Sequence, residues 1–187
     1  MAEYITTYTG EHFFPLEPDG EKLKIEDIAH ALSLLCRGNG HVTHFFSVGQ
    51  HCIHCALEAQ ARGYSRAVCL ACLLHDGSEA YLSDVPRPFK KTLPSYQRLE
   101  EQFLSILYRR FLGRDLRADE KKLVKEIDDD MLYFDLKELL GETPDQKPPV
   151  MKSSFSLDYV PFEEVERKYL ELYRLFKPEA VADIREK

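Results

Sequence analysis

The stretch Ser65–Asp76 reads SRAVCLACLLHD and is apolar on nearly every side from Val68 to Leu74. A helix that is apolar all round is normally surrounded by other helices, so this stretch predicts a buried central helix. It ends in His75 and Asp76, which are costly to bury unless they are paired, ligated or solvated. A solvated polar turn is the simplest interpretation of such a dipeptide taken alone.

Apolar residues recur at helical spacing in most of the remaining chain. A first helix is predicted over 25–35, before the glycines at 38 and 40, and a second from Ser47 to about Arg62. Ser47 and Gln50 have the spacing of a capping box at the start of that second helix. Further helices are predicted over about 95–112, 119–140 and 161–176, the last with Pro161 in its first turn. The stretch 84–94 contains three prolines and is predicted to be a loop.

These elements predict an all-α fold in one domain spanning 1–187. Its expected parts are a short N-terminal hairpin or irregular arm (1–22), a helical core (23–140), a loop (141–160), and a C-terminal helix and tail (161–187). A length of 187 residues is that of a single domain able to bury a core.

Composition excludes several classes of protein. The formal net charge of −7 argues against a nucleic-acid-binding or membrane-surface protein, which would present a basic face. No window is apolar enough for a membrane span, and the first residues lack a signal-peptide pattern. With five cysteines and no export signal, we expect reduced thiols in a cytoplasmic protein.

Four of the cysteines form two CxxC pairs, Cys52/Cys55 and Cys69/Cys72. This spacing also occurs in zinc ribbons, where tight glycine- or proline-bearing turns direct both sulfurs to one ion. Here both pairs lie inside predicted helices among apolar residues, so small buried core thiols are the better interpretation.

His51 is expected close to His75 and Asp76. The helices that carry them are joined by a very short turn, so they should pack antiparallel, and the start of one lies beside the end of the other. In the acidic run that begins at Asp128, only Asp128 has apolar neighbours both one turn before and one turn after it, at Val124 and Leu132. Periodicity therefore predicts that Asp128 is the inward carboxylate.

Two histidines and two aspartates form a mixed nitrogen and oxygen set for one divalent ion. Such a set, completed by water, suits an octahedral ion better than a closed tetrahedral zinc site. Glu79, four residues after His75, can converge on the same side if the helix continues for one more turn. His41, His44 and His54 are further histidines that the sequence alone does not assign.

The pattern His51, His75-Asp76 and Asp128 resembles the HD-domain metal-dependent phosphohydrolases, and several segments resemble their 5′-deoxynucleotidase-like bacterial and phage branch. The segments that carry the resemblance are Tyr8–Gly10, Ile25–Leu32, Ser47–His51, His75–Tyr81 and Asp84–Lys90, in a match extending to about Phe176. Gly77 stands where that family more often has alanine, and the loop His41–His44 departs from the nucleotidase pattern.

The resemblance implies one divalent metal ion (Mn, Co, Ni, Fe, Mg or Zn) held by His51, His75, Asp76 and Asp128. It also implies that Glu79 and Asp84 orient or activate the water and the leaving group, and that Arg37 binds phosphate or substrate. A homodimer is implied by the resemblance only.

The basic side chains of one loop also indicate a phosphorylated substrate. The stretch 84–98 carries Arg87, Lys90, Lys91 and Arg98 against a single acid, Asp84. Cations beside a metal ion suit a phosphate monoester, and Arg87 and Lys90 are the expected substrate-binding residues. For Lys91 and Arg98 a solvated basic loop is an equally good interpretation.

We therefore expect a metal-dependent phosphohydrolase that cleaves a small phosphate monoester, a nucleoside 5′-monophosphate above all, by metal-activated water. One alternative is a phosphodiesterase or dinuclear oxygenase of the same superfamily, which would need further histidine ligands. No histidine follows His75 in the sequence, which counts against it. The other alternative is a non-catalytic nucleotide sensor.

Overall fold

The computed structural model describes residues 3–179 and is all-α apart from one small hairpin. Residues 1–2 of the expected arm and 180–187 of the expected tail lie outside the described residues. The hairpin pairs β1 (Ile5–Thr6) antiparallel with β2 (His12–Phe13), as predicted for the arm. None of the described helices is long and apolar enough to cross a bilayer.

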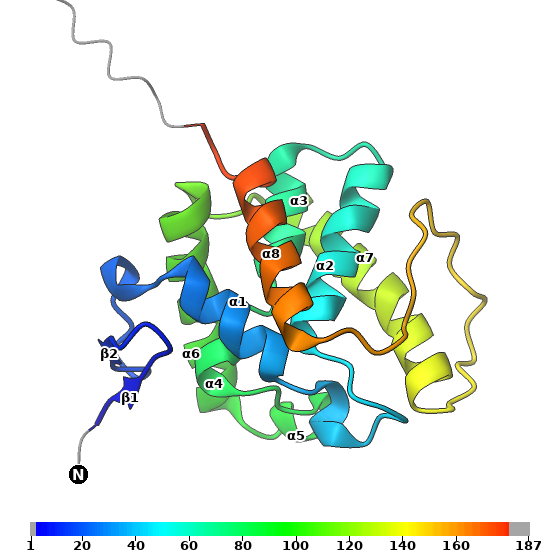
Figure 1. Ribbon diagram of the computed structural model, residues 1–187, viewed down its shortest axis with the longest axis horizontal. Coiled ribbons are helices and arrows are strands. Elements are labelled where there is room, and N and C mark those ends of the chain that lie inside the picture. The colour runs from blue at the N-terminus through cyan, green and yellow to red at the C-terminus, as the bar shows by residue number, and fades with distance from the viewer. Residues whose placement is uncertain (1–2, 180–187) are drawn as a thin grey trace, which may run out of the picture.

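The helices are arranged around a central pair. Their bounds are α1 Ile25–Leu34, α2 Val48–Ala61, α3 Arg66–Leu74, α4 Glu79–Leu82, α5 Arg87–Lys90, α6 Pro94–Leu112, α7 Ala118–Phe134 and α8 Phe162–Phe176. Helices α2 and α3 form a hairpin that packs against α7 and α8, while α1 packs on α2 and α8 (Figure 1). Every residue of α3 from Val68 to Leu74 is buried, which confirms the predicted central helix.

Serine caps begin both central helices. The Oγ atom of Ser47 accepts from the backbone N–H of Gln50 at 3.1 Å, and the Oγ atom of Ser65 accepts from that of Val68 at 3.3 Å. The Gln50 side chain does not complete the predicted capping box. Its Nε2 donates to the backbone carbonyl of Asp158 at 3.0 Å and so connects α2 to the chain before α8.

The central helix ends at Leu74 with His75 as its C-terminal cap, close to the predicted end, and does not continue for another turn. Residues 75–78 form a tight turn, in which the N–H of Gly77 donates to the carbonyl of Leu74 at 2.8 Å. A Cβ at Gly77 would lie 2.6 Å from Cδ1 of Leu107. The close approach of α6 therefore explains glycine at this position.

Three other boundaries differ from the sequence prediction. The predicted loop 84–94 contains the short helix α5, and the helix predicted to reach residue 140 changes at Phe134 into a wider π-helical turn, Asp135–Leu139. Pro161 precedes the first residue of α8 instead of lying in its first turn.

The segment 141–160 contains neither helix nor strand and runs from the π-helical turn to α8, in yellow and orange in Figure 1. It is attached to α2 through Glu58, whose buried carboxylate accepts from the backbone N–H groups of Lys152 and Ser153 at 2.8–3.1 Å. Arg62 donates to the same carboxylate at 2.7 Å. This loop is therefore held against the core.

Candidate metal centre

His75 lies at the C-terminal end of α3 and presents one nitrogen to the interior. Its Nδ1 is 2.7 Å from the carbonyl oxygen of Cys72, which requires Nδ1 to carry the hydrogen. In the neutral imidazole the lone pair is then on Nε2, which lies 3.2 Å from Oδ2 of Asp76 and 3.6 Å from Oδ1 of Asp128. This nitrogen is buried and has no hydrogen-bond partner among the described residues.

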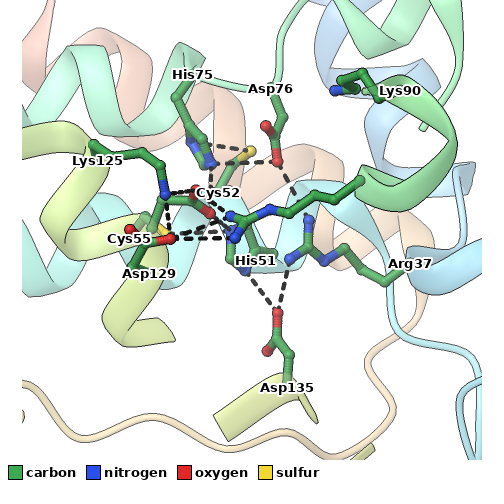
Figure 2. A network of polar contacts seen from close by, with 12 residues as sticks. Arg37, His51, Cys52, Cys55, His75, Asp76, Lys90, Lys125, Asp129 and Asp135 are labelled. Atoms are coloured by element: carbon green, nitrogen blue, oxygen red, sulfur yellow. Dashed lines mark hydrogen bonds and ion pairs between the residues drawn. The ribbon is translucent and has the colours of Figure 1, made fainter. Parts of the chain in front are cut away.

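His51 lies in the first turn of α2, is fully buried, and points toward the same place. Its Nδ1 lies 2.9 Å from Oδ2 of Asp135, and its Nε2 lies 3.3 Å from Oδ1 of Asp128. The His51 and His75 rings are 5.3 Å apart between centroids. One oxygen of Asp128 is therefore shared between the two nitrogens, and the structure brings together all four residues expected as ligands. Figure 2 shows three of them, His51, His75 and Asp76.

The separations between Asp128 and the two histidines, and between Asp76 and His75, are compatible with one divalent ion. Two atoms bound to one ion at about 2.0–2.2 Å lie about 3–3.6 Å apart, which matches the separations in this cluster. Although burial opposes ionisation, His75 and Arg37 hold the pKa of Asp76 below its ordinary value. Burial disfavours the His75 imidazolium, yet the neighbouring Asp76, Cys52 and Asp128 raise the pKa of His75 well above its ordinary value. The carboxylates therefore favour a positive charge beside them, whether a proton on His75 or a metal ion.

Asp135 is a site residue that the sequence reasoning missed. It is buried on the π-helical turn after α7 and contacts His51 on the side away from Asp128. A carboxylate in this position holds an imidazole in one orientation and one tautomer, which is the usual support of a metal-binding histidine. The sequence did contain a signal for Asp135. It follows Asp128 by two helical turns, so the two carboxylates share one helix face.

Two arginines reach the cluster from different segments. Arg37 follows α1 in a tight turn (Arg37–Gly40) and donates to Oδ2 of Asp135 at 2.9 Å and to Oδ2 of Asp76 at 3.4 Å. Arg87 of α5, which is half-exposed, donates to Oδ2 of Asp128 at 3.0 Å. Both residues were expected to bind substrate, and both contact expected metal ligands directly.

Lys90 does not contact these carboxylates. Its Nζ is paired with Glu100 at 2.6 Å, and Figure 2 shows it apart from the histidines and aspartates. Burial raises the pKa of Glu79, and the charge of Lys90 opposes that shift.

Glu79 begins α4 and is buried, and its Oε2 has no hydrogen-bond partner within residues 3–179. Burial, together with the negative charges of Asp76 and Asp84, raises the pKa of Glu79 well above its ordinary value. Asp84 is half-buried in the loop between α4 and α5. The structure therefore places Glu79 next to Asp76, with its backbone N–H donating to the carbonyl of Asp76 at 2.9 Å, and Glu79 favours its uncharged form.

The remaining histidines lie outside the cluster. Nε2 of His44 lies 2.7 Å from the carbonyl oxygen of Leu157, so this side chain contacts the 141–160 loop. His54 packs between the rings of Phe46 and Phe155. His41 is exposed.

The cysteines of the two CxxC pairs are buried and free, as expected of core thiols. Two of them nonetheless contact the imidazoles. Sγ of Cys55 lies 3.5 Å from Nε2 of His51, and Sγ of Cys52 lies 3.9 Å from Nδ1 of His75. The sequence signal for the first contact was the four-residue spacing between His51 and Cys55 on one helix face.

No family model matches the chain. The uncharacterized protein YfdR of Escherichia coli K12 is 37% identical over 109 residues, which span 58% of this chain and 58% of YfdR. The uncharacterized protein RCAP_rcc00048 of Rhodobacter capsulatus is 31% identical over 139 residues, which span 71% of each protein. The extent of this second match shows that the chain belongs to the same protein family as RCAP_rcc00048.

Proposed function

We propose that this protein is a phosphohydrolase of the HD-domain superfamily that cleaves a small phosphate monoester, specifically a nucleoside 5′-monophosphate. One observation carries the proposal. The Nε2 atoms of His51 and His75 converge on one oxygen of Asp128, with Asp76 beside them. This is a set of nitrogen and oxygen donors from three segments that suits a divalent metal with open positions.

A divalent ion held by these residues would lower the pKa of a bound water and polarise a phosphoryl oxygen. Asp135 supports this role by orienting His51, and the carbonyl of Cys72 does the same for His75. Arg37 lies between Asp76 and Asp135 and holds both carboxylates in place. Arg37 is thus better suited to holding the carboxylates near the metal in place than to moving away from them to bind substrate.

Arg87 is the cation best placed to meet a phosphate group. Its guanidinium is half-exposed and lies 3.0 Å from Asp128, at the edge of the cluster. A guanidinium can bind two phosphate oxygens at once and stabilise the negative charge that develops on them. Its contacts with Asp128 and Asp129 orient it until a phosphate competes for them.

Glu79 has the properties of a proton donor to the leaving alcohol. A buried carboxyl group next to two carboxylates keeps its proton more readily than a solvated one, and the pKa of Glu79 is raised accordingly. Asp84 contributes one of these two charges. In this proposal Glu79 donates the proton, and Asp84 helps to keep Glu79 protonated.

A cavity next to Arg87 supports a substrate of nucleotide size. Its volume is about 510 Å³, within the range typical of small-molecule sites. It extends from Arg87 to the 141–160 loop, and its walls combine apolar and polar groups. The lining residues are Arg87, Asp129, Leu132, Tyr133, Leu136, Pro144, Asp145 and Gln146. The Tyr133 ring and the leucines suit a planar base, and Asp145 and Gln146 offer hydrogen bonds to its edge.

The proposal is tested by a phosphate-release screen over nucleoside 5′-monophosphates and sugar phosphates, repeated with Mn, Co, Ni, Mg, Zn and Fe(II). We expect metal-dependent release that is lost in Asp76→Asn together with the bound metal, which is measured by elemental analysis. Glu126→Gln is the matched control, because Glu126 is an exposed carboxylate of α7 that pairs with Arg62.

Full activity and full metal content in Asp76→Asn would contradict the proposal. Tight nucleotide binding by a metal-loaded protein that releases no phosphate from any substrate would instead favour a sensor. Two irons per chain would favour a dinuclear oxygenase.

A further inference from the structure

The Cys55 thiol lies on the side of His51 that faces the candidate centre. The two residues are four positions apart on α2 and therefore share a helix face. Sγ of Cys55 lies 3.5 Å from Nε2 of His51, which is the nitrogen directed at Asp128, and the residue is 1% exposed. One ligand atom each from His51, Cys55 and His75 lie within 4.8 Å of one another.

We propose that Cys55 is an additional ligand of the metal centre and supplies it with one sulfur. This inference rests on the metal centre of the proposed function. With bonds of about 2.0 Å to nitrogen and about 2.3 Å to sulfur, two ligand atoms on one ion lie about 3.1–3.6 Å apart. The observed separation of 3.5 Å is within that range.

A second observation points to the same space. Nε2 of His75 is buried without a hydrogen-bond partner in the described part of the chain, and its nearest polar neighbours are the carboxylates of Asp76 and Asp128. A buried polar atom without a hydrogen-bond partner calls for an explanation, and an ion bound in this space would provide one. His75 and Cys55 approach that space from adjacent helices, α3 and α2.

The contact between Cys55 and His51 has a different meaning with and without an ion. Without an ion, Sγ of Cys55 and Nε2 of His51 lie within the distance of a weak hydrogen bond. When Nε2 binds an ion through its lone pair, that hydrogen bond is no longer possible. A sulfur–metal bond then forms, the S–H bond breaks, and the proton leaves to solvent.

Cys52 provides an internal contrast. It forms a second close group with His75 and Asp76, but its sulfur lies 3.9 Å from Nδ1 of His75. That nitrogen donates to the carbonyl of Cys72 and cannot bind a metal at the same time. The two cysteines are three residues apart on one helix and equally buried, so they differ mainly in which imidazole nitrogen they face.

A sulfur ligand changes which metal the centre prefers. Thiolate favours zinc, cobalt and iron over magnesium, whereas the histidines and carboxylates alone accept all of them. The sequence-based expectation of an octahedral nitrogen and oxygen site is then replaced by a mixed site with one soft donor. Cys55 becomes a specificity-determining residue in place of a core thiol.

The test is cobalt binding to the full chain, followed by absorption spectroscopy and equilibrium dialysis. For the wild type we expect visible cobalt bands and an intense near-ultraviolet band from sulfur-to-cobalt charge transfer. Cys55→Ser should keep bound cobalt and the visible bands and lose the charge-transfer band. Cys52→Ser, the matched control, should keep both.

A wild-type protein that binds cobalt without the charge-transfer band overturns the proposal, as does a Cys55→Ser variant that retains that band. A wild type that binds no cobalt, zinc or manganese overturns the metal centre itself, which is a separate failure. In competition between zinc and manganese, Cys55→Ser should lose an order of magnitude or more of the preference for zinc.

Folding of the variants is checked by circular dichroism and thermal melting, with Cys55→Ala as a second substitution. The wild type also provides a readout that needs no variant. X-ray absorption of the zinc-loaded protein should show one sulfur neighbour at about 2.3 Å, and a shell of nitrogen and oxygen only would refute the assignment.

Discussion

The carboxylate of Asp135 lies 2.9 Å from Nδ1 of His51. The carboxylate faces this nitrogen, while the other ring nitrogen, Nε2, lies 3.3 Å from Oδ1 of Asp128. The contact depends on the π-helical turn that follows α7, because Asp135 is part of that turn and lies beside His51 in the first turn of α2. The orientation of one predicted ligand is thus determined by a residue from a distant part of the sequence.

Asp135→Asn should therefore weaken metal binding. The amide keeps the size of the side chain but removes the charge that orients His51, and such supporting residues are worth about 10–100-fold in metal affinity. Affinity is measured by competition with a chelating dye. Glu138→Gln, an exposed position on the same turn, is the control. Equal affinities in wild type and Asp135→Asn would refute the orienting role.

Glu79→Gln should lower kcat by about 10²–10⁴-fold and leave the metal content unchanged, because the amide cannot transfer a proton to the leaving group. The protonated carboxyl is the active form, so the rate should be present below the pKa of Glu79 and fall as pH rises through it. Burial, Asp76 and Asp84 raise that pKa.

Asp84→Asn removes one of these negative charges, so the pKa of Glu79 should fall and the loss of rate at alkaline pH should begin at a lower pH. An unshifted profile in Asp84→Asn would contradict this coupling.

Gly77→Ala should destabilise the protein by roughly 1–3 kcal/mol, the usual cost of overpacking. The added Cβ would lie 2.6 Å from Cδ1 of Leu107 and 2.9 Å from the carbonyl oxygen of Leu74. Urea unfolding measures the loss. In a Leu107→Ala background the same substitution should cost less, because the first clash is removed. If the losses in free energy of unfolding caused by the two substitutions simply add, Leu107 is not the side chain that excludes the added Cβ.

Glu58→Gln should weaken the attachment of the 141–160 loop and lower the free energy of unfolding by roughly 1–3 kcal/mol. Although burial opposes it, hydrogen bonds from Ser153 and Arg62 lower the pKa of Glu58. The carboxylate therefore contributes stability above the ordinary pKa of a glutamate, and that contribution is lost as pH falls through the lowered value.

Urea unfolding at a series of pH values from neutral to about pH 3 measures how much the free energy of unfolding falls in acid. That fall should be smaller in Glu58→Gln than in the wild type. The exposed Glu164 of α8 provides the control substitution Glu164→Gln. Identical pH dependence in wild type and Glu58→Gln would exclude Glu58 as the titrating group.

Much of the helical framework followed from local patterns. The cap at Ser47 depends on a residue three positions away, and the burial of 68–74 depends on an unbroken apolar run. The approach of His51 to His75 needed only a short turn between two helices, and the choice of Asp128 needed only its neighbours one turn away. These inferences involve contacts within a helix or between sequential helices.

The failures share a different origin. The helix predicted through residue 140 becomes a π-helical turn, and the Gln50 amide bonds to Asp158 instead of its own helix. The partner of Gln50 lies 108 residues further along the chain. No local pattern contains that information.

The sequence alone therefore determined the helical class, the buried central helix and the four residues expected to bind a metal, because helix periodicity records which face is buried. Only the tertiary structure decided what surrounds those four residues. Asp135 behind His51, Arg37 and Arg87 on the aspartates, and the Cys55 sulfur beside Nε2 are set by side-chain directions between packed helices and loops. Those directions depend on how segments distant in sequence pack together, which periodicity does not encode.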